Sequence, residues 1–139
     1  MPVKPTIIPN LRYRDAVPAI EFLCQAFGFK EHAVFADPDD PSIVHHAQLV
    51  RDGNMIMVSS VVESEFAKVL TTVKEAGGNT QTLYVTLDDV DGHAEQARSK
   101  GARIFMEPED QDYGGRSYSV LDTEGNAWTF GSYDPFADS

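Results

Sequence analysis

The chain contains an internal repeat, and this repeat restricts its fold more than any other feature of the sequence. The segment "DGNMIMV", which begins at Asp52, returns as "EGNAWTF" from Glu124. Two candidate helix N-caps, Asp15 and Asp89, have almost the same separation along the chain, and so do the glycines that would end these helices. The separation between the two copies falls by one position from the helix N-caps to the glycines that end the helices, and by one more to the hairpins. Small deletions in a duplicated unit would produce this drift. The sequence therefore predicts two copies of one module.

Each copy has the pattern of a strand, a helix and three further strands. In the first copy, a β-type run at 6–12 precedes a helix between Asp15 and Gly28 whose apolar side chains form one stripe. The β-type runs "FKEHAVFA", "IVHHAQLV" and "NMIMVSS" follow, and the last two meet at an Asp-Gly pair typical of a two-residue hairpin. The second copy repeats the order with "TLYVTL", a helix after Asp89, "ARIFMEP", "RSYSVL" and "AWTFGSY".

This order predicts an α+β fold of two βαβββ modules whose sheets join around a cleft, within a single domain over residues 1–139. Module one should cover about 6–60, a polar linker about 61–79, and module two about 80–133. One helix covers one face of a four-stranded sheet and leaves the other face open, so two modules bury more surface by joining. We expect a ligand to bind in the cleft that the open faces line.

The charge balance of the chain narrows its possible partners. Its 22 acidic and 11 basic side chains give a formal net charge of −11, which repels nucleic-acid phosphates and anionic lipids. We therefore expect no nucleic-acid partner and no membrane partner. The start "MPVKPTIIPN" lacks the apolar run of a signal peptide, and Cys24, the single cysteine, cannot form an internal disulfide. These features favour a cytoplasmic protein.

The repeated motifs resemble the vicinal oxygen chelate superfamily, which includes glyoxalase I, extradiol dioxygenases, fosfomycin-resistance enzymes and bleomycin-resistance proteins. The resemblance spans about residues 6–133, and the runs "TQTLYVTLDDVDGHAEQARSKGARI" and "DYGGRSYSVLDTEGNAWTFGSYDP" are most similar to its glyoxalase-like or bleomycin-resistance-like subgroup. The resemblance implies that the protein is a homodimer. Members include enzymes of several reaction classes and proteins that only bind, so the resemblance indicates the fold more strongly than the function.

In the metal-dependent members, each module supplies one metal ligand from its first strand, typically His or Gln, and one from its last strand, typically Glu. The corresponding positions in this chain are Ile8, Met57, Thr82 and Thr129. None of them offers the imidazole, carboxylate or thiolate that zinc, iron and manganese sites use. The mismatch argues against a metal-dependent enzyme, and we expect no metal and no other cofactor.

Alternation along the strands predicts which side chains face the cleft. Trp128 and Phe130 should face the helix and belong to the core, whereas Arg12 should contact either a ligand or an internal acidic partner. His93 should be solvated. The predicted cleft-facing set comprises Ile8, Asn10, Arg12, Met55, Met57, Ser59, Thr82, Tyr84, Thr86, Ala127, Thr129 and Gly131. The candidate ligand-binding residues are Arg12, His46, Gln48, Met57, Tyr84, Thr129, Arg116 and Tyr118.

The leading hypothesis is a metal-independent protein that binds and sequesters a small organic molecule, as bleomycin-resistance proteins do. The net charge of −11 favours a cationic ligand held by stacking and by acidic side chains. One alternative is a glyoxalase-like lyase or isomerase, or a dioxygenase, with a metal or acid–base site at other positions. A second alternative is an orphan structural dimer whose interface is its only role.

Overall fold

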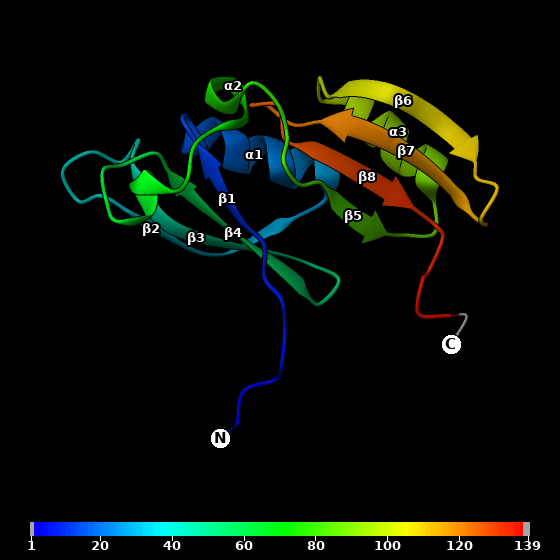
Figure 1. Cartoon of the computed structure of the whole chain (residues 1–139), viewed down its shortest axis with the longest axis horizontal. Helices are drawn as coiled ribbons and strands as arrows, with labels where there is room; N and C mark the ends of the chain where they lie inside the picture. The colour runs from blue at the N-terminus through cyan, green and yellow to red at the C-terminus, as the bar shows by residue number, and fades with distance from the viewer. Residues whose placement is uncertain (1, 138–139) are drawn as a thin grey trace.

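The computed structural model describes residues 2–137 and contains two four-stranded sheets, each accompanied by one long helix (Figure 1). The first sheet has the order β1-β4-β3-β2 and the second the order β5-β8-β7-β6. In each sheet the first strand runs parallel to the last, and the other pairs are antiparallel. This arrangement confirms the predicted α+β fold of two βαβββ modules.

The elements follow one another in the predicted order. The first module consists of β1 (Asn10–Tyr13), α1 (Ala16–Phe27), β2 (Lys30–Ala36), β3 (Val44–Arg51) and β4 (Asn54–Ser60). The linker carries a short 3-10 helix, η1 (Phe66–Lys68), and the four-residue helix α2 (Val73–Ala76). The second module consists of β5 (Leu83–Thr86), α3 (Val90–Ser99), β6 (Arg103–Asp110), β7 (Arg116–Leu121) and β8 (Ala127–Gly131). None of the helices within residues 2–137 has the length and apolarity needed to span a membrane.

Strand pairing supports the alignment of the two halves. Asn10 of β1 lies beside Met57 of β4, and Tyr84 of β5 lies beside Thr129 of β8. Asn10 and Tyr84 are as far apart along the chain as the two capping aspartates, Asp15 and Asp89. Met57 and Thr129 are as far apart as the glycines of the two hairpin turns. The duplicated unit is therefore visible in the hydrogen-bonding register as well as in the sequence.

The two capping aspartates behave differently. Asp89 accepts a hydrogen bond from the backbone N–H of Gly92 (3.0 Å) and so caps α3, as its position predicts. Asp15 precedes α1 but its side chain makes no capping hydrogen bond. Instead, the backbone N–H groups of Arg14 and Asp15 donate to the carboxylate of Glu124, at 2.6 and 2.7 Å. The start of α1 is thus tied to the turn between β7 and β8 in the other module.

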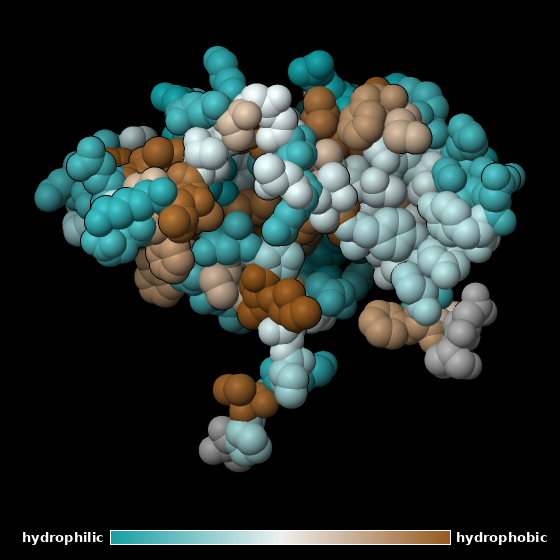
Figure 2. All heavy atoms as spheres, in the orientation of Figure 1, coloured by the Kyte–Doolittle hydropathy of each residue, from teal (hydrophilic) through white to brown (hydrophobic). Residues whose placement is uncertain are grey.

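The first strand is shorter than the β-type run at 6–12 predicts. It starts at Asn10, because Pro5 and Pro9 lack the N–H group that a strand residue donates. The carbonyl of Pro9 still accepts the N–H of Met57 at 2.9 Å. The preceding residues extend away from the sheet, and Figure 2 shows hydrophobic residues along this segment, where Ile7 is 95% exposed.

Both modules share one hydrophobic core on the helix side of the sheets. Phe27, at the end of α1, packs its ring 5.3 Å from the ring of Trp128 and 4.9 Å from that of Phe130, and all three side chains are fully buried. The prediction that Trp128 and Phe130 belong to the core is confirmed. Figure 1 shows the modules side by side, with the linker and α2 crossing between them. The two sheets are not hydrogen-bonded to each other. This side-chain packing is therefore what joins them.

Candidate functional site

The open face of the first sheet carries four of the predicted candidates. Gln48 lies beside Met57, which itself lies beside Asn10, so these side chains share one face. His46 is on the same face, where its Nε2 lies 3.0 Å from Nε2 of Gln48 and its ring stacks on Phe35 at 6.1 Å. The fourth candidate, Arg12, lies at the end of this face that the linker covers.

Arg12 forms no ion pair with an acidic side chain of the described residues, which corrects one of its two predicted roles. Its Nη2 donates to the backbone carbonyl of Val62 at 2.6 Å, while its Nε is buried and, among the described residues, has no hydrogen-bond partner. The guanidinium therefore fastens the start of the linker to β1. A backbone carbonyl takes the place of the predicted internal ion pair.

The open face of the second sheet carries small hydroxyl side chains and the ring of Tyr84. Thr129 and Ser119 form a hydroxyl–hydroxyl hydrogen bond of 2.7 Å. Tyr84 donates its hydroxyl to the carbonyl of Tyr133 at 2.7 Å, and its side chain remains 40% exposed. A Cβ atom on Gly131 would lie 2.6 Å from the Tyr84 hydroxyl oxygen, so the tyrosine lies across this glycine.

Tyr118 and Arg116 are not on the open face, which corrects their prediction as cleft residues. Tyr118 pairs with Phe130 and shares its helix-facing side, so its side chain is buried in the core. Arg116, two positions earlier, forms ion pairs with Asp91 on α3 (3.0 Å) and with Asp110 on β6 (3.4 Å). Alternation along β7 turns both side chains toward the helix side.

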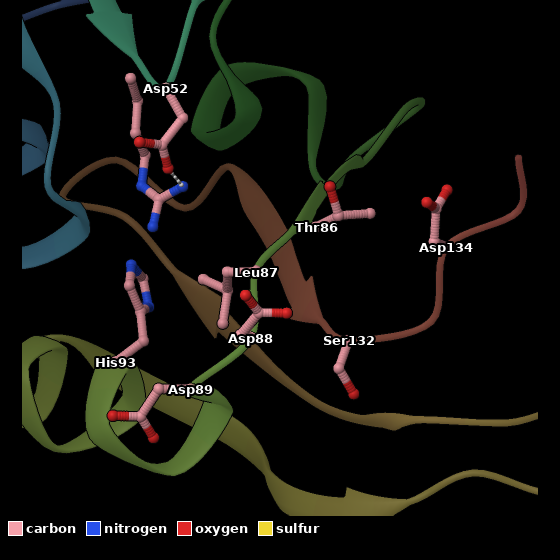
Figure 3. Close-up of a pocket in the computed structure, with 9 residues that line it drawn as sticks. Asp52, Thr86, Leu87, Asp88, Asp89, His93, Ser132 and Asp134 are labelled. Atoms are coloured by element: carbon pink, nitrogen blue, oxygen red, sulfur yellow. Dashed lines mark hydrogen bonds and ion pairs between the residues drawn. The ribbon is translucent and has the colours of Figure 1, made fainter. Parts of the chain in front are cut away.

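A pocket of about 550 Å³ opens between the two modules (Figure 3). We call it the inter-module pocket. Its wall comes from the β3–β4 turn, the end of β5, the loop into α3, α3 itself and the segment after β8. The residues that line it are Arg51, Asp52, Thr86, Leu87, Asp88, Asp89, His93, Ser132 and Asp134.

Carboxylates dominate the charge of this pocket. Four aspartates line it against one arginine, and Arg51 is already engaged by Asp52 (3.0 Å) and by the carbonyl of Phe27 (3.1 Å). Within residues 2–137, neither Asp88 nor Asp134 has a basic side chain within 4.0 Å. The pocket therefore offers negative charge that no residue of the described chain neutralises at close range.

His93 forms part of the pocket wall, and its partly buried position corrects the prediction that it is solvated. Its Nδ1 lies 2.6 Å from the Tyr118 hydroxyl and its Nε2 lies 3.0 Å from the carbonyl of Phe27. Because a carbonyl can only accept, Nε2 carries the proton and Nδ1 accepts from Tyr118. Burial lowers the pKa of His93, and the nearby charge of Arg51 lowers it further, against the raising effects of the Phe27 carbonyl and Asp89.

Acid should destabilise the fold through His93. Because its pKa is lowered in the folded state, the unfolded chain binds more protons once the pH falls below roughly 6.5, the ordinary histidine value. The contribution of neutral His93 to stability is therefore complete above that pH and is lost progressively as the pH falls from there toward the folded-state pKa. Urea unfolding between about pH 5 and pH 7.5 should show a steeper loss of stability in the wild type than in His93→Gln. Parallel curves would contradict this expectation.

Sequence reasoning missed the inter-module pocket because its walls come from turns that are far apart along the chain. Asp52 belongs to a hairpin turn in one module, whereas Asp88 precedes a helix in the other and Asp134 follows its last strand. Thr86 was the one lining residue placed in the predicted cleft. The excess of 11 negative charges was the only signal that pointed to an acidic site, and it gave no location.

The residues at the four expected metal-ligand positions do not fit a metal. Ile8 and Thr82 precede their strands, Met57 offers only a thioether, and the Thr129 hydroxyl is already bonded to Ser119. Over the described range, no three His, Cys, Asp or Glu side chains come together as a possible metal site. The donor chemistry of these positions therefore gives no basis for a metal-dependent step.

Comparisons with known proteins agree with this architecture. A family model of the Glyoxalase/Bleomycin resistance protein/Dioxygenase superfamily matches residues 7–130. An uncharacterized protein of Mycobacterium bovis is 33% identical over 129 residues, which are 93% of this chain and 84% of that protein. TioX from Micromonospora sp. ML1 has a TM-score of 0.70 and 29% identity, covering 92% of this chain and 98% of TioX. The fosfomycin resistance protein FosX from Listeria monocytogenes shares the fold, with a TM-score of 0.70 at 13% identity over 96% of this chain and 97% of FosX.

Proposed function

Because the chain belongs to the Glyoxalase/Bleomycin resistance protein/Dioxygenase superfamily, we propose that it is a small-molecule-binding protein that holds an organic cation without a metal. The observation that carries the proposal is the inter-module pocket of about 550 Å³, which four aspartates line and in which Asp88 and Asp134 have no basic partner among the described residues. A cavity of this size is within the range of small-molecule sites, roughly 300–1,000 Å³. The family match confirms the resemblance seen in the sequence.

Two features of the pocket favour a cation over a neutral or anionic ligand. The carboxylates of Asp88 and Asp134 have no close basic partner in the part of the chain that the structure describes, although Oδ1 of Asp134 accepts the backbone N–H of Phe136 at 2.9 Å. Their charge is therefore available to a ligand. Thr86 lines the pocket and shares a strand face with Tyr84, whose ring is 40% exposed. A cation bound by the aspartates could therefore also contact an aromatic face.

The absence of suitable donors at the superfamily's metal positions supports a metal-independent role. Ile8, Met57, Thr82 and Thr129 replace the His, Gln and Glu side chains that metal-dependent members use. The open sheet faces then present a mixed surface of hydroxyl, thioether, amide and aromatic groups. Such a surface suits recognition of an organic molecule. None of His46, Gln48, Met57, Tyr84 and Thr129 lines the inter-module pocket, so we propose them as contacts of the open sheet faces and not of the cation in the pocket.

We propose that the binding form is a homodimer in the cytoplasm with no nucleic-acid or membrane partner. Each sheet ends at a four-residue strand, β1 or β5, whose outer edge pairs with no strand of the described chain. The N-terminal segment also exposes Val3 and Ile7, which are 88% and 95% accessible. A second copy could pair with these edges and cover these side chains, and the formal charge of −11 opposes anionic polymers and lipids.

Titration calorimetry against a panel of cationic glycopeptides and aromatic amines tests the proposal, with sedimentation of the same sample giving the number of chains. We expect at least one cation of the panel to bind. Its affinity should fall as the salt concentration rises, because salt screens the attraction between the cation and the aspartates. The double variant Asp88→Asn/Asp134→Asn should weaken that binding about tenfold, or 1.4 kcal/mol.

The matched control is Asp39→Asn/Asp112→Asn, which removes the same charge from two exposed loops outside the pocket. It should bind as the wild type does. Failure of every panel member to bind, or equal affinity of the two double variants, would count against the proposal.

A further inference from the structure

We infer that a groove between α1 and β2 is a second ligand site, which takes a hydrophobic organic ammonium ion. This α1–β2 groove has a volume of about 480 Å³ and lies within the first module, with no residue in common with the inter-module pocket. The residues that line it are Val17, Ile20, Glu21, Cys24, Gln25, Glu31, Val34, Ala36, Pro41 and Val44.

The walls of the groove are apolar and partly uncovered. Val17 on α1 and Val34 on β2 are 45% and 39% exposed, and both point into the same groove. Ile20 and Val44 are buried and form the part of the lining that belongs to the core. An apolar ligand body would cover Val17 and Val34 and remove their side chains from water, which is favourable.

The charged groups of the groove have one sign. Glu21 and Glu31 line it, and none of the lining residues is a lysine, an arginine or a histidine. Glu21 accepts a hydrogen bond from Gln25 at 3.2 Å, and neither glutamate has a basic side chain within 4.0 Å among the residues described. Carboxylates beside an apolar wall complement a ligand with an apolar body and a positive head, and they disfavour an anion.

Cys24 provides a reporter inside the groove. It is the only cysteine of the chain and is partly buried. Burial raises the pKa of its thiol, and the nearby charge of Glu31 raises it further, so the thiol stays protonated and reacts slowly at neutral pH. A ligand in the groove would block the approach of a reagent to this sulfur.

Alkylation of Cys24 by the neutral reagent iodoacetamide, followed by mass spectrometry, tests the inference. The probes are 4-phenylbutyltrimethylammonium, 4-phenylbutanol and 4-phenylbutyrate, which share a body and differ in charge. We expect the ammonium ion to slow alkylation at least about threefold at saturation, because it fills the groove. The alcohol should protect less and the carboxylate least. No protection by the ammonium ion, or equal protection by all three, would overturn the inference.

Variants locate the effect and separate it from the inter-module pocket. In Glu21→Gln/Glu31→Gln, the ammonium ion should protect Cys24 no better than the alcohol does. In Glu63→Gln/Glu65→Gln, a matched pair in the exposed linker, the ammonium ion should still protect Cys24 better than the alcohol. Protection is taken as the ratio of rates with and without probe in each variant, because loss of Glu31 itself changes the thiol pKa. Asp88→Asn/Asp134→Asn should leave protection unchanged. If it abolished protection, the ligand would bind in the inter-module pocket and the inference would be wrong.

Discussion

Replacing Asp122 by alanine should lower the free energy of unfolding by about 3–5 kcal/mol. Asp122 is only 5% exposed and joins the two modules. Its Oδ2 accepts the hydroxyl of Tyr13 (2.5 Å) and the indole N–H of Trp128 (3.1 Å), and its Oδ1 accepts backbone N–H groups of the β7–β8 turn. Burial, followed by the charge of Asp122, raises the pKa of Tyr13, so this hydroxyl remains a donor. Alanine would leave both buried donors without a partner.

Urea unfolding followed by Trp128 fluorescence measures this loss. Asp122→Asn should cost less than the alanine change, because one side-chain oxygen remains to accept a hydrogen bond. Asp112→Ala, in the exposed β6–β7 loop, is the control and should stay within about 0.5 kcal/mol of the wild type. A loss from Asp122→Ala no larger than that of the control would show that the two modules do not depend on this carboxylate.

Replacing Phe27 by alanine should also cost about 3–5 kcal/mol. Its ring is fully buried and packs against Phe22 (5.2 Å), Trp128 (5.3 Å) and Phe130 (4.9 Å), so removing it opens a cavity between α1 and β8. The same residue presents its carbonyl to His93 and Arg51. A shift of the helix end would therefore also disturb the wall of the inter-module pocket.

The conservative variant Phe27→Leu should lose less stability than Phe27→Ala, because most of the apolar volume is kept. Phe136→Ala is the matched control, since that ring is 88% exposed and should contribute within about 0.5 kcal/mol. Calorimetric melting of the three variants gives the order. If Phe27→Ala and Phe136→Ala had the same melting temperature, the packing of aromatic rings around Phe27 would not be a main source of stability.

The inferences that came correctly from sequence alone rest on neighbouring residues. Asp89 caps α3, and the Asp52-Gly53 turn has positive φ at both residues, 48° and 80°, as its Asp-Gly pair predicts. Period-2 alternation correctly places Trp128 and Phe130 on the helix side. These features depend on short chain segments, which the sequence displays directly.

The inferences that failed depend on contacts between distant segments. His93 was expected in solvent, yet Tyr118 and the carbonyl of Phe27 hold it at the boundary of the modules. An internal carboxylate was one of the two partners expected for Arg12, yet its guanidinium donates to the backbone carbonyl of Val62. In both cases the partner belongs to another element, far away along the chain, and no local pattern specifies it.

The sequence by itself determined the duplicated βαβββ fold, the helix-facing residues and the poor donors at Ile8, Met57, Thr82 and Thr129, because periodicity and repeat offsets are properties of the linear chain. Only the tertiary structure decided where the negative charge gathers. It brings Asp52, Asp88 and Asp134 around one cavity because α1 and α3 pack the modules together on their helix sides. The packing of two amphipathic modules on each other sets the relative position of their turns, and that position cannot be read from either module alone.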